Sequence, residues 1–202
     1  MTGITITTII LGILFYWFIL RNPKSSKSDN SILPIELIPK SMHQYNVRAR
    51  ITEEQWKAVC KVVHRNNVGN KWHCQVCHQK GTTQGFNHPV ECHEVWEFDD
   101  KTRTQKLVNL KTLCPLCHKF THLGLATKQG FGDKVIQHGS KVRKCSTNSI
   151  EKELKQQYSI ANERGQYNWK LDLTYMNNPK FSFLKTKFTN DEKQNCTPKS
   201  EY

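Results

Sequence analysis

The chain has 202 residues, which allows one domain of ordinary size with short appendages. Thirty Lys and Arg against seventeen Asp and Glu give a formal net charge of +13, and the pI is near 9.4. This charge favours a polyanionic partner such as nucleic acid. A basic surface with no specific ligand would have the same composition. No internal repeat is visible, so a repeat architecture is not expected.

The first apolar segment runs from Gly3 to Leu20, eighteen residues without a charge. This is long enough to cross a bilayer as a helix, so residues 1–21 are predicted to be a transmembrane anchor. Arg21, Lys24 and Lys27 follow at once, which by the positive-inside rule puts the rest of the protein in the cytoplasm. A cleaved signal peptide is the main alternative, but the segment lacks a basic n-region and a small-residue cleavage site.

A flexible linker is predicted for residues 22–36, which begin with the polar, Ser-rich stretch NPKSSKSDNS. The apolar segment ILPIELIP, residues 32–39, contains two prolines and is expected to lie extended against the domain. Thr52 and Gln55 then form a predicted capping box. The helix that follows has an apolar stripe at helical spacing, made of Trp56, Val59, Cys60 and Val63.

Two CxxC pairs, separated by a few tens of residues, indicate a tetrahedral structural zinc site. The expected ligands are Cys74, Cys77, Cys114 and Cys117. Such a zinc would join the loop before residue 90 to the start of a later helix, which a small core needs. A disulfide pair, or a zinc ribbon without catalysis, is the alternative. Of the other cysteines, Cys60 is expected to be buried, and Cys145 and Cys196 have no assigned role.

A β-hairpin followed by a helix is predicted between the two CxxC pairs and just beyond them. The first strand is rich in β-branched and aromatic residues and is followed by a polar turn. The strand, turn and return strand are residues 90–98, 99–105 and 106–110. Pro115 suits the first turn of a helix, which places His118 and His122 four residues apart on one face. Two imidazoles in this arrangement can bind one cation.

The stretch from Glu91 to His122 resembles the HNH endonuclease motif in the order and spacing of its polar residues. The matching positions are His93-Glu94, Asn109, His118 and His122. The resemblance implies an α+β fold in which a hairpin and a helix form a ββα-metal domain, with a structural Zn²⁺ and flanking helices. It implies hydrolysis of phosphodiester bonds in nucleic acid, with DNA favoured, and a second divalent ion, Mg²⁺ or another. In the family, Asn109 would orient the general base, and His118 and His122 would bind the ion.

Two registers of the motif give His93 and Glu94 different roles. If His93 is the base, Glu91 fills the preceding ligand position, since Cys92 suits a hard cation poorly. If His93 is a ligand, Glu94 stands in the position of the base and Val95 matches the aliphatic residue that follows it. Strand alternation places Glu91 and His93 on one face, and an imidazole suits a base near neutral pH. Both features favour His93 as base, with Glu94 kept as the alternative.

The C-terminal third is predicted to complete the domain and then to become disordered. After an irregular helical segment, Ser149 is the expected N-cap of a helix that ends near Arg164, and Asn168 to Tyr175 alternates like a strand. The wider resemblance to an uncharacterised group of bacterial and phage HNH proteins covers residues 37–176, which are the predicted nuclease domain. Residues 177–202, rich in Lys, Asn and Thr, are expected to be a disordered tail.

These expectations describe a membrane-anchored HNH nuclease whose catalytic domain lies in the cytoplasm. A catalytically inactive zinc module that binds nucleic acid or protein at the membrane is the alternative from another class. A secreted nuclease with a processed signal is the third. The sequence does not indicate the oligomeric state or any preference for a substrate sequence.

Overall fold

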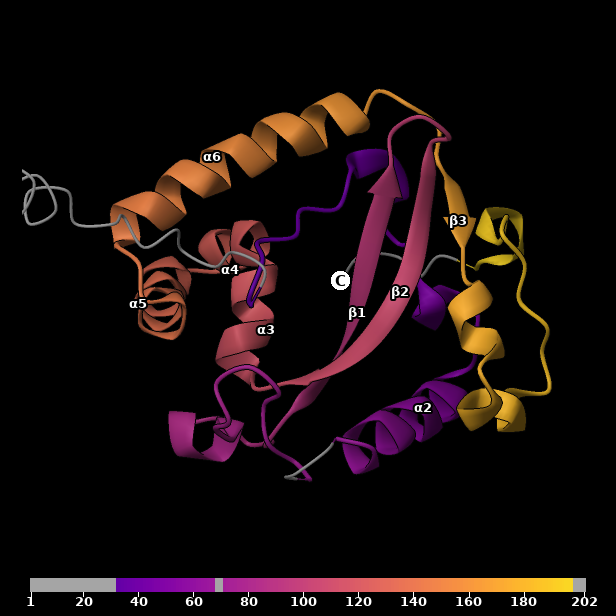
Figure 1. Cartoon of the computed structure of the whole chain (residues 1–202), viewed down its shortest axis with the longest axis horizontal. Coiled ribbons are helices and arrows are strands. Elements are labelled where there is room, and N and C mark those ends of the chain that lie inside the picture. The colour runs from indigo at the N-terminus through magenta and orange to yellow at the C-terminus, as the bar shows by residue number, and fades with distance from the viewer. Residues whose placement is uncertain (1–31, 68–70, 198–202) are drawn as a thin grey trace, which may run out of the picture.

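The computed structural model describes residues 32–67 and 71–197, and it has an α+β architecture built around one long hairpin (Figure 1). The helices and strands are α2 (Glu53–Arg65), β1 (Glu91–Asp99), β2 (Thr104–Leu113), α3 (Pro115–Thr121), α4 (Leu123–Lys128), α5 (Gly132–Arg143), α6 (Thr147–Arg164) and β3 (Lys170–Asp172). Short 3-10 turns include η1 (Lys40–Met42), η4 (Thr174–Asn177) and η5 (Pro179–Leu184). Within these described residues no helix is long and apolar enough to cross a membrane. The predicted anchor, Gly3 to Leu20, lies outside them.

The sheet has three strands in the order β1-β2-β3. β1 and β2 pair antiparallel from Glu91 opposite Leu113 to Asp99 opposite Thr104, so the predicted hairpin is present, with a longer return strand than expected. The register shifts between Val95 and Trp96, which marks a bulge near the middle of the hairpin. β3 is parallel to β2 and shorter than the predicted strand, because the chain turns into η4 directly after it.

Local capping explains where α2 and α6 begin. The predicted capping box is confirmed at α2, where the Thr52 hydroxyl accepts from the Gln55 N–H and the Gln55 side chain accepts from the Thr52 N–H. At α6 the N-cap is Ser146, whose hydroxyl accepts a bond from the Ser149 N–H. The predicted cap, Ser149, is therefore wrong by three residues. Both serines can cap, and the sequence does not show which one the preceding turn places there.

Two apolar cores lie on either side of the hairpin. One packs the sheet against α2 and the C-terminal turns, and its largest buried members include Trp169, Leu107, Leu171, Phe181 and Phe188. The other packs α3, α4, α5 and α6 around Phe120, together with the N-terminal residues Leu33 and Ile35. The hairpin is thus held from both sides, and the helix that follows it is anchored in the second core.

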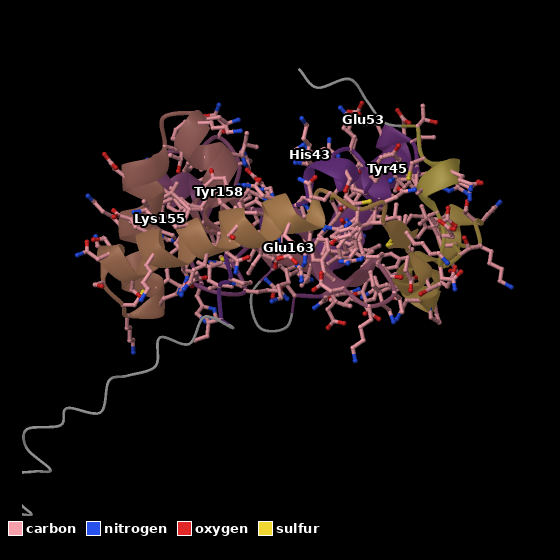
Figure 2. The ribbon with its side chains drawn as sticks, turned by 90° about the horizontal axis from the view of Figure 1, so that it is seen from above. His43, Tyr45, Glu53, Lys155, Tyr158 and Glu163 are labelled. Atoms are coloured by element: carbon pink, nitrogen blue, oxygen red, sulfur yellow. The ribbon has the colours of Figure 1, made fainter. Side chains whose placement is uncertain are left out.

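The helices around α3 approach one another at glycines. A Cβ atom at Gly139 of α5 would lie 1.9 Å from a ring carbon of Phe120, a buried residue of α3, so a larger residue would displace the helix. Figure 2 shows Tyr158 on α6, and a Cβ atom at Gly124 of α4 would lie 2.8 Å from its hydroxyl oxygen. The first of these contacts holds α3, which carries His118, closely against α5.

Both ends of the folded domain extend beyond the predicted boundaries of residues 37 and 176. Leu33 and Ile35, expected in the linker, are 1% and 3% exposed. On the C-terminal side, the Glu192 carboxylate accepts a hydrogen bond from Arg50 Nε at 2.6 Å. The Thr197 N–H donates to the Ala49 carbonyl at 2.8 Å. The expected disordered tail is therefore, up to residue 197, a segment packed on the domain.

Two phenylalanines of η5 provide a test of this packing. Phe181 is 1% exposed and Phe183 is 41% exposed. We expect Phe181→Ala to lower the free energy of unfolding by about 3–5 kcal/mol, because it leaves a cavity in the first core. Phe183→Ala, the matched control, should change it by less than about 0.5 kcal/mol. Urea unfolding of both variants measures the difference, and equal stabilities would show that the C-terminal segment does not belong to the core.

Candidate metal centres

The predicted cysteine cluster is assembled. The sulfur atoms of Cys74, Cys77, Cys114 and Cys117 all lie within 4.8 Å of one another, and none of the four is in a disulfide. Cys77 Sγ and Cys114 Sγ are 3.5 Å apart, close to the roughly 3.8 Å between sulfurs in a tetrahedral zinc–thiolate site. The cluster can therefore hold a metal such as zinc, and it joins the loop before β1 to the first turn of α3.

Donors around the cluster favour the thiolate form of the cysteines. The Val76 N–H donates to Cys74 Sγ, and the Gln84 side-chain amide donates to Cys114 Sγ at 3.3 Å. His138 Nε2 of α5 lies 3.2 Å from Cys117 Sγ. Cys114 is also the N-cap of α3, where the positive end of the helix dipole favours a negative sulfur. A ligand sulfur supported by such outer contacts keeps its orientation towards the metal.

A second cluster contains the three predicted site histidines. His93 comes from β1, His118 from α3, and His122 ends that helix. One ring nitrogen of each lies within 4.8 Å of the others, and the ring centroids are 5.0–5.3 Å apart. His93 is 2% exposed and the other two are partly buried. The hairpin and the helix thus bring together imidazoles from separate parts of the chain, at a spacing that could hold one ion.

Burial favours the neutral form of two of these imidazoles. It lowers the pKa of His93 to about 3, with further lowering by His118 and Lys111. It also lowers the pKa of His122 well below its usual value, again with a contribution from His118. A neutral imidazole offers a lone pair to a metal ion. At neutral pH these two rings are ready to act as ligands.

Glu91, a predicted ion ligand, is placed behind His118. One oxygen of its carboxylate contacts His118 Nδ1, and the other lies 2.6 Å from His88 Nε2. Burial acts to raise the pKa of Glu91, but the bonds and charges of His118 and His88 hold it at about 2. A carboxylate on one ring nitrogen of a histidine fixes the tautomer and leaves the other nitrogen for a metal. In this position Glu91 orients His118.

Glu94 lies on the opposite face of β1 from His93. Its carboxylate accepts a hydrogen bond from the Val47 N–H at 3.2 Å. Burial raises the pKa of Glu94 to about 7, against the lowering effects of the Val47 N–H and of Arg48. Because neighbouring strand residues point to opposite faces, Glu94 cannot join the histidine cluster while β1 keeps its register.

Asn109 lies at the bulge of the hairpin and is exposed. Its backbone pairs with Val95, and its side-chain oxygen accepts from the Leu110 N–H at 2.8 Å and from the Tyr175 hydroxyl at 3.0 Å. Neither of these side-chain partners belongs to β1. Asn109, which the resemblance makes the residue that orients the general base, therefore makes neither of these side-chain hydrogen bonds to the strand of His93 and Glu94.

A groove of about 730 Å³ opens onto the histidine cluster. Its lining includes the three clustered histidines as well as Glu94, Tyr45 and Arg48. Figure 2 shows Tyr45 on the N-terminal part of the domain. These residues come from residues 37–48, from β1 and from α3. The groove therefore joins parts of the chain that are far apart in sequence.

Two groups beside the cluster were not predicted from the sequence. Glu36 Oε2 lies 3.3 Å from His93 Nε2, and its side chain is only 14% exposed. Lys111 is opposite His93 in the hairpin register, and its charge acts on both Glu36 and His93. The sequence feature that could have identified Glu36 is that it is the only charged residue in the apolar segment 32–39, which contains two prolines. No sequence feature identifies Lys111, because its position opposite His93 depends on the register of β1 against β2.

A scan against protein-family models and searches of curated proteins and of solved structures found no significant match to this chain. The two side-chain clusters are therefore the basis for proposing a function.

Proposed function

We propose that the protein is a metal-dependent endonuclease of the HNH type that hydrolyses phosphodiester bonds of nucleic acid. The observation that carries the proposal is the meeting of His93, His118 and His122 at ion-binding distance, on a hairpin and the helix after it. The cysteine cluster supports it, because a structural zinc would hold the same hairpin and helix together.

The proposed roles follow from the contacts of each residue. When bound, a divalent ion would polarise the phosphate, activate water and stabilise the leaving oxygen. His118 and His122 would hold the ion, with Glu91 fixing the tautomer of His118. His93 would be the third ligand, because its nitrogen lies within the same compact group and its burial favours the neutral ring. An imidazole-rich set favours Mn²⁺, Co²⁺, Ni²⁺ or Zn²⁺ over Mg²⁺.

DNA is the proposed substrate. The net charge of +13 favours a polyanion, and the groove beside the histidines is lined by Arg48 as well. Arg48 is exposed, and its guanidinium carbon lies 5.7 Å from the centre of the Trp56 ring. A guanidinium held on an aromatic ring at the edge of a groove is well placed to contact a phosphate.

Plasmid cleavage tests the proposal. Purified full-length protein carrying zinc should nick or linearise plasmid when Mn²⁺ or Ni²⁺ is added, and chelation of that ion should stop the reaction. His118→Ala should cut at least about 10²-fold more slowly, since it removes a ligand of an ion that supplies several kcal/mol. If the folded wild-type protein cuts neither DNA nor RNA with any of these ions, a zinc-stabilised binding module is the better explanation.

We propose that residues 1–21 anchor the protein in a membrane, with the nuclease domain in the cytoplasm. The apolar segment and the basic residues after it support this. Fractionation should find the full-length protein with membranes, and protease added outside the cell should leave residues 32–197 intact. A soluble full-length protein, or a mature form outside the cell that begins after Leu20, would reject the anchor.

A further inference from the structure

Glu36 is held beside the histidine cluster by the segment that precedes the domain proper. Leu33 and Ile35, which come just before it in sequence, are buried in the second core. The Glu36 N–H donates to the Thr121 carbonyl at 2.7 Å, which fixes the segment to α3 one residue before His122. The position of the carboxylate is therefore set both by apolar packing and by a backbone hydrogen bond to the helix.

The Glu36 carboxylate and the His93 ring contact each other without a hydrogen bond. Glu36 Oε2 and His93 Nε2 are 3.3 Å apart, yet neither atom has a hydrogen-bond partner. The N–H of the ring is thus not directed at the oxygen. In a tetrahedral site with bonds of roughly 2.0–2.1 Å, neighbouring ligand atoms are about 3.3 Å apart. The observed separation, without a hydrogen bond, is therefore compatible with two atoms that bind one ion.

Burying the Glu36 carboxylate and the His93 ring without hydrogen-bond partners costs free energy of folding. A buried carboxylate oxygen and a buried imidazole nitrogen both lose hydration, which a cation would restore. The charge of Lys111 acts on Glu36, but the two side chains form no ion pair within the part of the chain that the structure describes. Glu36 stands outside the compact group of three histidines and reaches it at the His93 edge. For the carboxylate to share an ion with His118 and His122, the Glu36 side chain would have to turn towards those two rings.

We propose that Glu36 is the carboxylate ligand of the ion held by His93, His118 and His122, so that the site has three imidazoles and one carboxylate. This inference rests on the proposed function, because it concerns the same ion. The carboxylate adds a hard oxygen to an otherwise imidazole site and so increases its affinity for Mn²⁺ and Mg²⁺. It also makes the segment before the hairpin part of the active site.

Mn²⁺ binding to full-length protein that carries one equivalent of zinc, enough for the cysteine cluster alone, tests this assignment directly. Electron paramagnetic resonance measures free Mn²⁺ during a titration of the wild type, Glu36→Gln and a control, Glu97→Gln. Glu97 is an exposed carboxylate on β1, the strand of His93. We expect Glu36→Gln to weaken Mn²⁺ binding at least about 10-fold, since even outer-sphere partners of metal ligands are worth roughly 10–100-fold. Glu97→Gln should bind like the wild type.

Thermal unfolding without Mn²⁺ provides the check on the fold. Gln keeps the size of Glu, so Glu36→Gln should unfold near the wild-type temperature, and its weaker binding is then not a folding defect. If the wild type binds no second ion, the proposal for the three histidines fails. If the wild type binds Mn²⁺ and Glu36→Gln binds it as tightly, the histidine site stands and Glu36 is not a ligand, even if the variant cuts DNA slowly.

Discussion

Cys114→Ser is expected to unfold the domain. Cys114 is fully buried, caps α3 and belongs to a cluster whose two CxxC pairs come before and after the hairpin in the sequence. Structural zinc sites contribute about 10–16 kcal/mol of binding free energy in small domains. A domain of ordinary size is stable by only about 5–15 kcal/mol, so loss of the zinc leaves no margin.

Circular dichroism and metal analysis measure this effect together. Wild-type protein should carry one zinc, and Cys114→Ser should lose both the zinc and the cooperative unfolding transition. Cys145→Ser is the control, because Cys145 is a partly buried free cysteine outside the cluster. A folded Cys114→Ser protein, or a folded wild type with less than one equivalent of zinc, would contradict the structural role of the site.

His93→Ala is expected to lose ion binding and cleavage together. If His93 is a ligand, the rate of cleavage should fall by about 10²–10⁴, because the bound ion lowers the activation barrier by several kcal/mol. Raising the Mn²⁺ concentration should then restore part of the activity. Glu94→Gln should keep the affinity for the ion, because its carboxylate faces the Val47 N–H on the other side of β1.

Other results would assign His93 and Glu94 differently. A His93→Ala protein that binds Mn²⁺ normally but cuts about 10²–10⁴-fold more slowly would make His93 the general base. A Glu94→Gln protein that binds Mn²⁺ normally but fails to cut would give that role to Glu94. Plasmid cleavage and Mn²⁺ titration on the same preparations distinguish the three cases, with His118→Ala as the reference for a lost ligand.

Features set by neighbouring residues could be predicted from the sequence. The capping box at Thr52 defines the start of α2, and the β-branched and aromatic residues of the stretch 90–98 indicate β1. The spacing of the CxxC pairs indicates the cysteine cluster, because each pair is a local turn and the hairpin brings the two together. His118 and His122 are close for the same reason, since they are one helical turn apart.

Features set by tertiary packing could not be predicted. Glu36 reaches His93 only because Leu33 and Ile35 enter the core of α3 to α6, which a Ser-rich stretch before them conceals. The residues after 177 look polar in composition, yet Phe181 and Phe188 supply two buried rings to the other core. The contact of Glu91 with His118 depends on how β1 packs against α3, which the order of residues does not give.

Anomalous diffraction from crystals of the zinc-loaded protein grown with Mn²⁺ would locate both proposed ions in one experiment. We expect a zinc among the four cysteine sulfurs and a separate manganese between His93, His118 and His122, with Glu36 among its ligands. Manganese density at the histidines should vanish in His118→Ala while the zinc remains. A zinc peak alone, at a Mn²⁺ concentration that supports plasmid cleavage, would contradict the proposal that the three histidines hold the catalytic ion.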